Sequence, residues 1–177
     1  MLTFVLGGAR SGKSAYARSL CASRPVVFVA TARDDGDGEW SQRIARHRRD
    51  RPSAWRTVEA PTDIAAALET VRVDEVALVD CLGVWLSNLM YEQRDLAPDA
   101  AEARILGEVE RFLAAARRLD VVVVSNEVGG GTVPEHPVAR RFRDLLGLSN
   151  QWVARAADRV FLVTAGLPAV LKGGGTP

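Results

Sequence analysis

Short apolar runs alternate with longer amphipathic stretches along the chain. Five runs are almost entirely β-branched or aliphatic, and they predict strands buried on both faces, at residues 2–6, 26–30, 76–79, 121–124 and 160–163. A sixth segment, residues 56–59, alternates polar and apolar positions, and we expect it at an edge of the sheet. Strands that alternate with helical segments are typical of a parallel sheet covered by helices.

The segments between the strands predict helices. In residues 98–119 the side chains of Ile105, Val109 and Phe112 fall on one helical face, with charged residues away from it. Another helix is expected to begin with Thr62 as its N-cap. The predicted helices cover residues 13–22, 40–49, 62–71, 83–91, 98–119 and 138–158. Loops are expected at residues 7–11, 34–39 and 129–137.

The composition predicts one domain. The chain has 177 residues, of which 47% are hydrophobic and 25% charged, enough for a single buried core. We expect that domain over residues 1–172, followed by a disordered glycine-rich tail at residues 173–177. No apolar run approaches the roughly 18 to 20 residues that a membrane helix needs, so we expect no membrane span.

The net charge and the numbers of cysteines and histidines argue against several classes of binding and structural site. Lysine and arginine (23) against aspartate and glutamate (22) leave a net charge of +1, which argues against binding nucleic acid or an anionic membrane through a bulk basic field. Two cysteines and two histidines are too few for a disulfide framework or a protein-only zinc site. We therefore expect a cytoplasmic protein whose anion binding is local.

A phosphate-binding loop follows the first predicted strand. The pattern G-x-x-x-x-G-K-[ST] stands directly between a predicted strand and a predicted helix, which is the context that a P-loop requires. It comprises Gly7, Gly8, Ala9, Arg10, Ser11, Gly12, Lys13 and Ser14. Backbone N–H groups of such a loop surround a phosphate, and the helix start adds its positive dipole end. The alternative is a glycine turn that joins strand and helix by chance.

Phosphate and metal ligands are expected around this loop. Arginine supplies 21 of the 23 cations, so the retained Lys13 is singled out as a point charge on the terminal phosphates. The hydroxyl of Ser14 would ligate Mg²⁺, and Asp80, at the end of a neighbouring parallel strand, would supply a carboxylate. The alternative is that Asp80 caps the next helix. Residues 125–127 end another strand at the same carboxyl edge, where ligands bind in open α/β sheets.

The densest charge cluster surrounds a histidine. On a helix, Arg43, His47 and either Asp50 or Arg51 are spaced by three or four residues and share a face. Cationic neighbours disfavour imidazolium, so His47 would be a neutral nucleophile while the guanidiniums hold phosphate oxygens. The alternative is a solvated helix face, the usual role of a charge run. The other histidine, His136, is expected at the surface of a loop.

These segments together resemble one family, the bifunctional adenosylcobinamide kinases and adenosylcobinamide-phosphate guanylyltransferases of cobalamin biosynthesis. The resemblance extends over nearly the whole chain. The P-loop alone is shared with many NTPases, whereas the histidine stretch and the segment after residue 124 are far more particular. Besides the P-loop, the markers are Ala30 and Thr31; Arg43, His47, Arg51, Trp55, Thr57 and Glu59; Asn88 and Leu89; residues 125–129 and 133–135; and Asn150 and Gln151.

The resemblance implies an α/β fold of the P-loop NTPase (RecA-like) class, with three layers and a mostly parallel central sheet. It implies phosphorylation of adenosylcobinamide at its aminopropanol hydroxyl, followed by transfer of GMP from GTP to adenosylcobinamide phosphate, giving adenosylcobinamide-GDP and pyrophosphate. In such enzymes a histidine is guanylylated as a covalent intermediate, and the residue of this sequence that matches it is His47. The substrates would be GTP, ATP and the corrinoid, with Mg²⁺ as the cofactor.

The resemblance also implies nucleotide contacts and an assembly. Outside the P-loop the nucleotide would contact Thr31, Ala32, Arg33, Arg48, Arg49, Asp50, Arg51, Glu59 and Asp80. The assembly would be a homotrimer, with helices and loops of adjacent subunits lining the corrinoid cleft. The sequence departs from the family's pattern at Leu148 and Ser149, and again at His136 and Pro137. Both departures lie in the part that the resemblance assigns to corrinoid or subunit contacts.

Without the resemblance, the residues are also compatible with two other functions. One is a small-molecule P-loop kinase without a covalent intermediate, in which the arginines around His47 form a lid over the γ-phosphate. The other is a regulatory nucleotide-binding switch that hydrolyses slowly and signals to a partner. Labelled nucleotide separates them, because a kinase transfers only the γ-phosphate, a guanylyltransferase transfers the α-phosphate, and a switch needs no acceptor.

Overall fold

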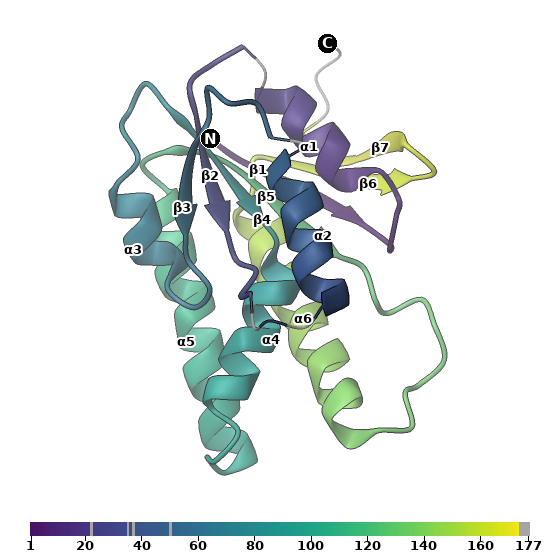
Figure 1. Ribbon diagram of the computed structural model, residues 1–177. Coiled ribbons are helices and arrows are strands. Elements are labelled where there is room, and N and C mark those ends of the chain that lie inside the picture. The colour runs from purple at the N-terminus through teal and green to yellow at the C-terminus, as the bar shows by residue number, and fades with distance from the viewer. Residues whose placement is uncertain (22, 35, 37, 50, 174–177) are drawn as a thin grey trace.

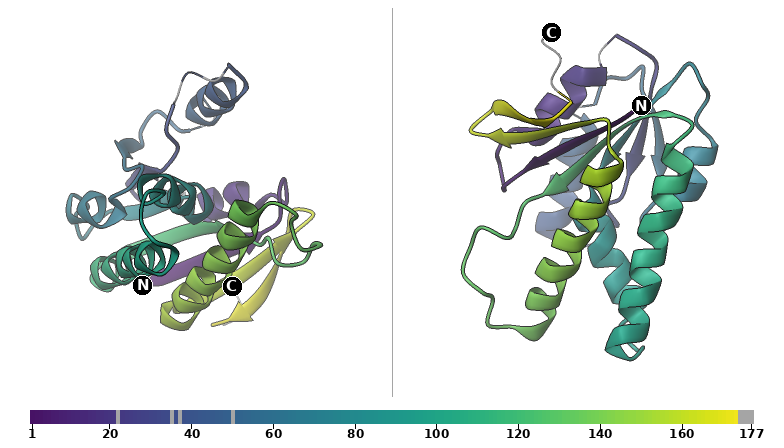
Figure 2. Two further views of the ribbon diagram at one scale, coloured as in Figure 1. Left: turned by 90° about the horizontal axis from the view of Figure 1, so that it is seen from below. Right: turned by 180° about the vertical axis from the view of Figure 1, so that it is seen from behind.

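A seven-stranded sheet lies between helices on its two faces (Figures 1 and 2). The computed structural model describes residues 1–21, 23–34, 36, 38–49 and 51–173, with the backbone alone at residues 39, 40, 43 and 47. This three-layer arrangement confirms the predicted α/β fold class. Within the described residues, no helix is long and apolar enough to cross a membrane.

The strands follow the predicted runs closely. They are β1 (Leu2–Gly7), β2 (Val26–Ala30), β3 (Arg56–Glu59), β4 (Val76–Asp80), β5 (Asp120–Asn126), β6 (Arg159–Thr164) and β7 (Leu167–Lys172). Their order across the sheet is β3-β2-β4-β5-β1-β6-β7, and all neighbours are parallel except β6 and β7. The expectation that residues 56–59 form an edge strand is confirmed, because β3 pairs only with β2 in the described sheet.

The strand β7 was not predicted. It forms an antiparallel hairpin with β6 through Ala165 and Gly166, which both have positive φ, at 51° and 82°. Such a turn matches the twist of a two-residue hairpin. All six residues of β7 are exposed although the segment LPAVLK is apolar at every position but Lys172, and Pro168 within it is atypical of a strand.

Each face of the sheet has its own core. On one face, Phe4 and Val123 pack with helices α3 (Ile64–Glu69), α4 (Leu82–Glu92), α5 (Pro98–Ala116) and α6 (Pro137–Ala156). On the other, Val5 and Val124 pack with α1 (Lys13–Cys21). Successive side chains of a strand point to opposite faces, which is why these runs are apolar at every position. Figure 2 shows α2 (Gly38–Arg49) standing away from both helical layers.

Two helix starts differ from the prediction. Helix α3 begins after Asp63, whose carboxylate accepts a hydrogen bond from the Ala66 N–H at 3.0 Å, so Thr62 is not its N-cap. The carbonyl of Thr62 instead accepts a hydrogen bond from the indole of Trp85 at 2.7 Å. Helix α2 begins at Gly38, inside the predicted loop 34–39. Of the predicted tail, residues 174–177 lie outside the described part of the chain.

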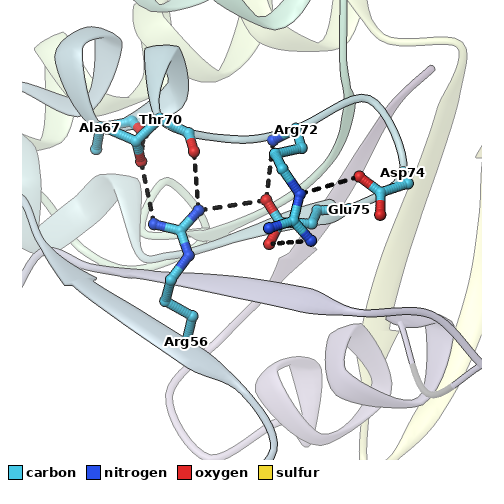
Figure 3. A network of polar contacts seen from close by, with 6 residues as sticks. All are labelled: Arg56, Ala67, Thr70, Arg72, Asp74 and Glu75. Carbon is cyan, nitrogen blue, oxygen red and sulfur yellow. Dashed lines mark hydrogen bonds and ion pairs between the residues drawn. The ribbon is translucent and has the colours of Figure 1, made fainter.

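A polar network ties the edge strand β3 to the segment before β4 (Figure 3). Glu75, whose side chain is only 6% exposed, accepts a hydrogen bond from the Arg72 backbone N–H at 2.9 Å and from the Arg56 guanidinium at 3.3 Å. Arg56 also donates to the carbonyl of Thr70 at the end of α3, at 2.8 Å. The network thus joins β3, the end of α3 and the segment before β4.

Candidate active site

The P-loop connects β1 to α1, as its sequence predicts. Gly12 adopts φ +93°, and a Cβ there would lie 3.0 Å from the Cα of Gly166. The N–H of Gly166 donates to the carbonyl of Ser11 at 2.8 Å, so the β6–β7 turn supports the loop from outside. Both observations explain why the chain needs glycine at position 12. The ammonium of Lys13 donates to the carbonyl of Gly8 at 3.0 Å, which holds it across the loop.

The strand order corrects one expectation about Asp80. The strand beside β1 is β5, and β4 lies beyond it, so Asp80 ends the next-but-one strand rather than a neighbouring one. The carboxyl ends of these strands nevertheless meet, because Gly7 is in register with Asn126 and Asp80 with Val124. The residue between Asp80 and the P-loop is therefore Asn126.

A cavity of about 150 Å³ lies at this carboxyl edge. It brings together seven of the predicted contact residues, Ala9, Arg10, Lys13, Ser14, Ala32, Arg51 and Asp80. It is also lined by Phe28, Ala30, Ile44, Cys81, Val84 and Asn126. Ile44 is 6% exposed and comes from α2, so this helix forms one wall of the cavity.

Asp80 faces the cavity and does not cap the following helix. The N-cap of α4 is Cys81, and its side chain makes no capping hydrogen bond. Burial raises the pKa of the Cys81 thiol to about 11, and the neighbouring Asp80 carboxylate contributes to the rise, so the thiol stays protonated and is a poor nucleophile. With Asp80 and Ser14 on one cavity, two hard oxygen donors of the kind that Mg²⁺ prefers are available.

Arg51 lies over an aromatic ring on the cavity wall. Its guanidinium carbon is 3.8 Å from the centroid of Phe28, which in turn stacks with Trp55 at 6.4 Å between centroids. Burial lowers the pKa of Arg51, partly offset by the Glu59 carboxylate, and the side chain remains cationic. Its Nη1 donates to the Thr57 hydroxyl at 3.4 Å, and its Nε is buried without a hydrogen-bond partner among the described residues, so stacking on Phe28 and this one bond position the cation.

The other arginines that were predicted to contact the nucleotide are not among the described residues that line the cavity, and two of them form ion pairs. Arg33 pairs with Glu92 at 2.7 Å, and Arg48 pairs with Glu59 at 3.2 Å. Arg49 is exposed. The backbone of His47 lies in α2, near the carboxyl end of that helix, while its side chain and the whole of Asp50 are outside the described part of the structure.

Thr31 lies behind the cavity wall. Its side chain is fully buried, and its hydroxyl donates to the carbonyl of Cys81 at 3.0 Å and accepts from the Cys81 N–H at 2.9 Å. The Asn88 amide donates to the carbonyls of Thr31 and Pro61, at 2.8 and 2.9 Å. These bonds join the ends of β2 and β4 and give the Asn88 marker a structural role that its sequence position alone did not indicate.

The chain matches one family over nearly its whole length. The model of that family, described as cobinamide kinase / cobinamide phosphate guanyltransferase, matches residues 3–171. The chain belongs to this family. It is 43% identical to the bifunctional adenosylcobalamin biosynthesis protein CobP of Pseudomonas aeruginosa, over 98% of this chain and 98% of that protein. It is 40% identical to CobU of Escherichia coli K12, over 97% and 100%, and 38% identical to CobU of Salmonella typhimurium LT2, again over 97% and 100%.

Among solved structures, the fold resembles a prototypical ATPase from the type III secretion system of pathogenic bacteria. The TM-score is 0.59 at 10% identity, over 96% of this chain and 56% of that one. A likeness at this identity concerns the fold alone, and it agrees with the P-loop class implied by the sequence. The family resemblance drawn from the motifs is confirmed by the family model and by the three relatives.

The cavity residues that the sequence did not single out are mainly apolar residues of its walls. Phe28 and Ile44 read as ordinary apolar positions, so nothing in their local pattern separates them from core residues. Asn126 had a signal, since it is a polar residue at the end of a buried strand. Its distance along the chain from both Lys13 and Asp80 concealed that it would lie between them.

Proposed function

We propose that this chain carries out both reactions of its family at one nucleotide site, as a single domain over residues 1–172. The observation that carries the proposal is the single cavity in which Lys13, Ser14, Arg51 and Asp80 meet beneath α2, the helix that contains His47. One triphosphate in this cavity has its terminal phosphates at the P-loop and its α-phosphate farther along the edge. Both transfers then use the same nucleotide site, each with its own nucleoside triphosphate.

The first reaction is phosphorylation of adenosylcobinamide. The acceptor hydroxyl oxygen forms a bond to the γ-phosphorus of ATP or GTP while the bond to the β–γ bridging oxygen breaks. The nucleoside diphosphate leaves with the electron pair, and the hydroxyl proton is released to water. Lys13 and the P-loop N–H groups bind the negative oxygens throughout, and this electrostatic support is the main protein contribution to phosphoryl transfer.

In the second reaction, GMP is transferred first to His47 and then to adenosylcobinamide phosphate. A neutral imidazole nitrogen forms a bond to the α-phosphorus of GTP, and pyrophosphate leaves with the electron pair of the broken α–β bond. A phosphate oxygen of adenosylcobinamide phosphate then forms a bond to the same phosphorus, and the electron pair of the P–N bond returns to the ring. The second ring nitrogen keeps its proton throughout. Arg48 and Arg51 are neighbours of His47 in the sequence, and cations near its ring would favour the neutral form.

Ser14 and Asp80 are the residues that would hold Mg²⁺. Their hydroxyl and carboxylate oxygens line the cavity together, and phosphate oxygens and water would complete the six ligands of the ion. When bound, Mg²⁺ supplies charge neutralisation on the phosphates. The two free cysteines, Cys21 and Cys81, suit a reducing compartment, and we assign the protein to the cytoplasm.

The corrinoid and a second subunit are assigned to the groove between α4 and α6. This groove has a volume of about 570 Å³ and includes Tyr91 and Val138, which are 62% and 59% exposed. His136, one of the departures from the family's pattern, also lines it. We assign the contact of a homotrimer to this groove because it exposes apolar side chains, Tyr91 and Val138 among them, which adjacent subunits enclosing the corrinoid would cover. Sedimentation velocity at micromolar protein should give the mass of three chains, and a monomer would contradict the assignment.

The test of the proposal is the fate of labelled GTP. With α-labelled GTP and Mg²⁺, the protein should acquire a label that is lost in acid and retained in alkali, as expected of a phosphoramidate. His47→Asn should abolish this label and leave transfer of the γ-phosphate to adenosylcobinamide at least partly intact. For the α-label on the protein, which needs no corrinoid, His136→Asn is the matched control, because His136 is the other histidine of the chain and should leave this label unchanged. A wild-type protein that transfers γ-phosphate but takes up no α-label would instead be a simple kinase.

A further inference from the structure

Asn126 occupies the centre of the carboxyl edge. It is the last residue of β5, the strand that lies between the P-loop strand β1 and the Asp80 strand β4 (Figure 1). It is in register with Gly7, the first residue of the P-loop. Its side chain lines the same cavity as those of Lys13, Ser14 and Asp80. The position is therefore surrounded by the groups that bind the terminal phosphates.

The backbone of Asn126 is held from behind. Its carbonyl accepts a hydrogen bond from the Asn150 amide at 3.1 Å, and the carbonyl oxygen of Asn150's side chain accepts from the Ser125 hydroxyl at 2.7 Å. Asn150 is 7% exposed, so this clamp between β5 and α6 is shielded from water. A buried polar clamp fixes the strand end, and with it the direction in which the next side chain leaves the backbone.

The side chain of Asn126 lies beside the start of α4, but its amide group has no hydrogen-bond partner among the described residues. A Cβ built on Gly83, at the start of α4, would lie 3.8 Å from both Cβ and Cγ of Asn126, an ordinary van der Waals distance. Asn126 is half-buried, and its amide makes no hydrogen bond to any described residue. A donor fixed in place and facing a phosphate cavity has the nucleotide as its partner.

We infer that Asn126 is a further catalytic residue, whose side-chain N–H groups donate to an oxygen of the γ-phosphate during the kinase reaction. The inference rests on the function proposed above. As the acceptor oxygen bonds to the γ-phosphorus and the β–γ bond breaks, negative charge is redistributed over the γ oxygens and the bridging oxygen. A neutral amide stabilises that charge without adding to the repulsion already present beside Asp80. Asn126 gains and loses no proton in the step.

The two reactions should depend on Asn126 to different degrees. In the kinase reaction the γ-phosphorus is the reacting centre, so a donor on its oxygens acts where the charge changes. In guanylyl transfer the reacting centre is the α-phosphorus, and the γ-phosphate leaves unaltered as part of pyrophosphate. Removal of the amide should therefore slow γ-transfer far more than α-labelling.

The experiment compares Asn126→Ala and Asn126→Asp with wild type in both labelling assays. For Asn126→Ala we expect kcat for γ-transfer to fall on the order of a hundredfold with KM for the nucleotide little changed, the size of effect seen when one oxyanion donor is removed. The α-label should fall by less than about tenfold. Asn126→Asp keeps the shape but places a carboxylate against the phosphates, so its γ-transfer should be as slow as or slower than that of the alanine variant.

A leucine variant separates catalysis from packing, because it keeps the volume of the side chain without its amide and adds no charge. If Asn126 only filled the space beside Gly83, Asn126→Leu would preserve γ-transfer, and that result would overturn the inference. Equal loss of both reactions in Asn126→Ala would also overturn it. Lys172→Ala is the matched control, because it removes hydrogen bonds at the end of α6, away from the cavity, and should lower the melting temperature while leaving the ratio of the two rates unchanged. Absence of γ-transfer in wild type would refute the proposed function itself.

Discussion

Lys13 and Lys172 are the only lysines of the chain, and the structure gives them different surroundings. Lys13 crosses the P-loop, whereas Lys172 donates to the carbonyls of Ala154 and Arg155 at the end of α6, at 3.2 and 2.9 Å. A lysine at a helix end compensates the unpaired carbonyls and the negative end of the dipole. We therefore expect the same residue type to serve phosphate binding at one position and helix stability at the other.

We expect Lys13→Ala to slow both γ-transfer and α-labelling by about a hundredfold or more, because the phosphates then repel one another without a counter-charge. Its melting temperature should remain close to that of wild type, since Lys13 is only half-buried. Lys172→Ala should do the reverse, with wild-type rates and a small loss of stability, on the order of 0.5 kcal/mol. Steady-state rates and thermal unfolding of the two variants, measured side by side, test the contrast.

Asp80→Asn should raise the Mg²⁺ concentration required for half-maximal γ-transfer. The amide keeps the shape of the side chain but removes the negative charge that a hard cation requires, and we expect a shift of roughly tenfold. Folding should be unaffected, because Asp80 caps no helix. A magnesium titration of both proteins decides the matter. An unchanged requirement would move the metal to another carboxylate, such as Glu127.

At the scale of elements, the P-loop is a junction of three pieces rather than a free-standing turn. β1 leads into it, α1 leads out, and the hairpin turn between β6 and β7 hydrogen-bonds to it through Gly166. Gly166 and Gly12 approach so closely that neither the backbone conformation nor the available space at Gly12 suits a side chain. The unpredicted strand β7 therefore has a direct connection to the candidate active site.

Gly12→Ala should lower the free energy of unfolding by about 1 to 3 kcal/mol, the usual cost of a side chain at positive φ. It should also weaken GTP binding, because the loop N–H groups must shift to relieve the contact with Gly166. Gly8→Ala provides the comparison within the same loop, since no atom lies within 4 Å of a Cβ there. Urea unfolding should give Gly8→Ala a stability near that of wild type. Equal stability of the two variants would show that the close approach does not constrain the loop.

At the scale of the whole molecule, two carboxylates that pair with cations, those of Asp120 and Glu75, connect parts of the chain that are apart in sequence. The carboxylate of Asp120 accepts from the N-terminal ammonium at 2.8 Å and also from Arg24, which joins β5 to the chain start and to the segment before β2. These bonds lower the pKa of Asp120 below its ordinary value of 3.8. The Arg72 backbone N–H, together with the guanidiniums of Arg56 and Arg72, lowers the pKa of Glu75 below 4.5.

We expect acid to destabilise the protein through these groups. Because each folded pKa is below the unfolded value, the stabilisation is complete above about pH 4.5 and is lost as the pH falls through the folded pKa values. Melting temperatures from pH 7 to pH 3 should therefore decrease at the acid end. Glu75→Gln should lose about 1 kcal/mol at pH 7 and show a shallower decrease in acid. A Glu75→Gln curve parallel to that of wild type would assign the acid sensitivity to other carboxylates.

Local sequence determined the features that depend on neighbouring residues. Apolar runs marked the strands β1, β2, β4, β5 and β6, because a strand covered on both faces must be apolar at every position. The P-loop was visible because eight consecutive residues build it between a strand and a helix. The histidine stretch and the segment after residue 124 are likewise contiguous, and they sufficed to indicate the family.

Tertiary structure decided which of these segments meet. The order of the strands placed β5 between β1 and β4, and so put Asn126 rather than Asp80 beside the P-loop. It also buried Thr31 behind the cavity, and it set the β6–β7 turn against Gly12. Strand order and such contacts arise from packing between residues far apart in the chain, which no periodicity within a single segment encodes. Sequence therefore determined the chemistry that is available, and the packing of the sheet decided which groups share one cavity.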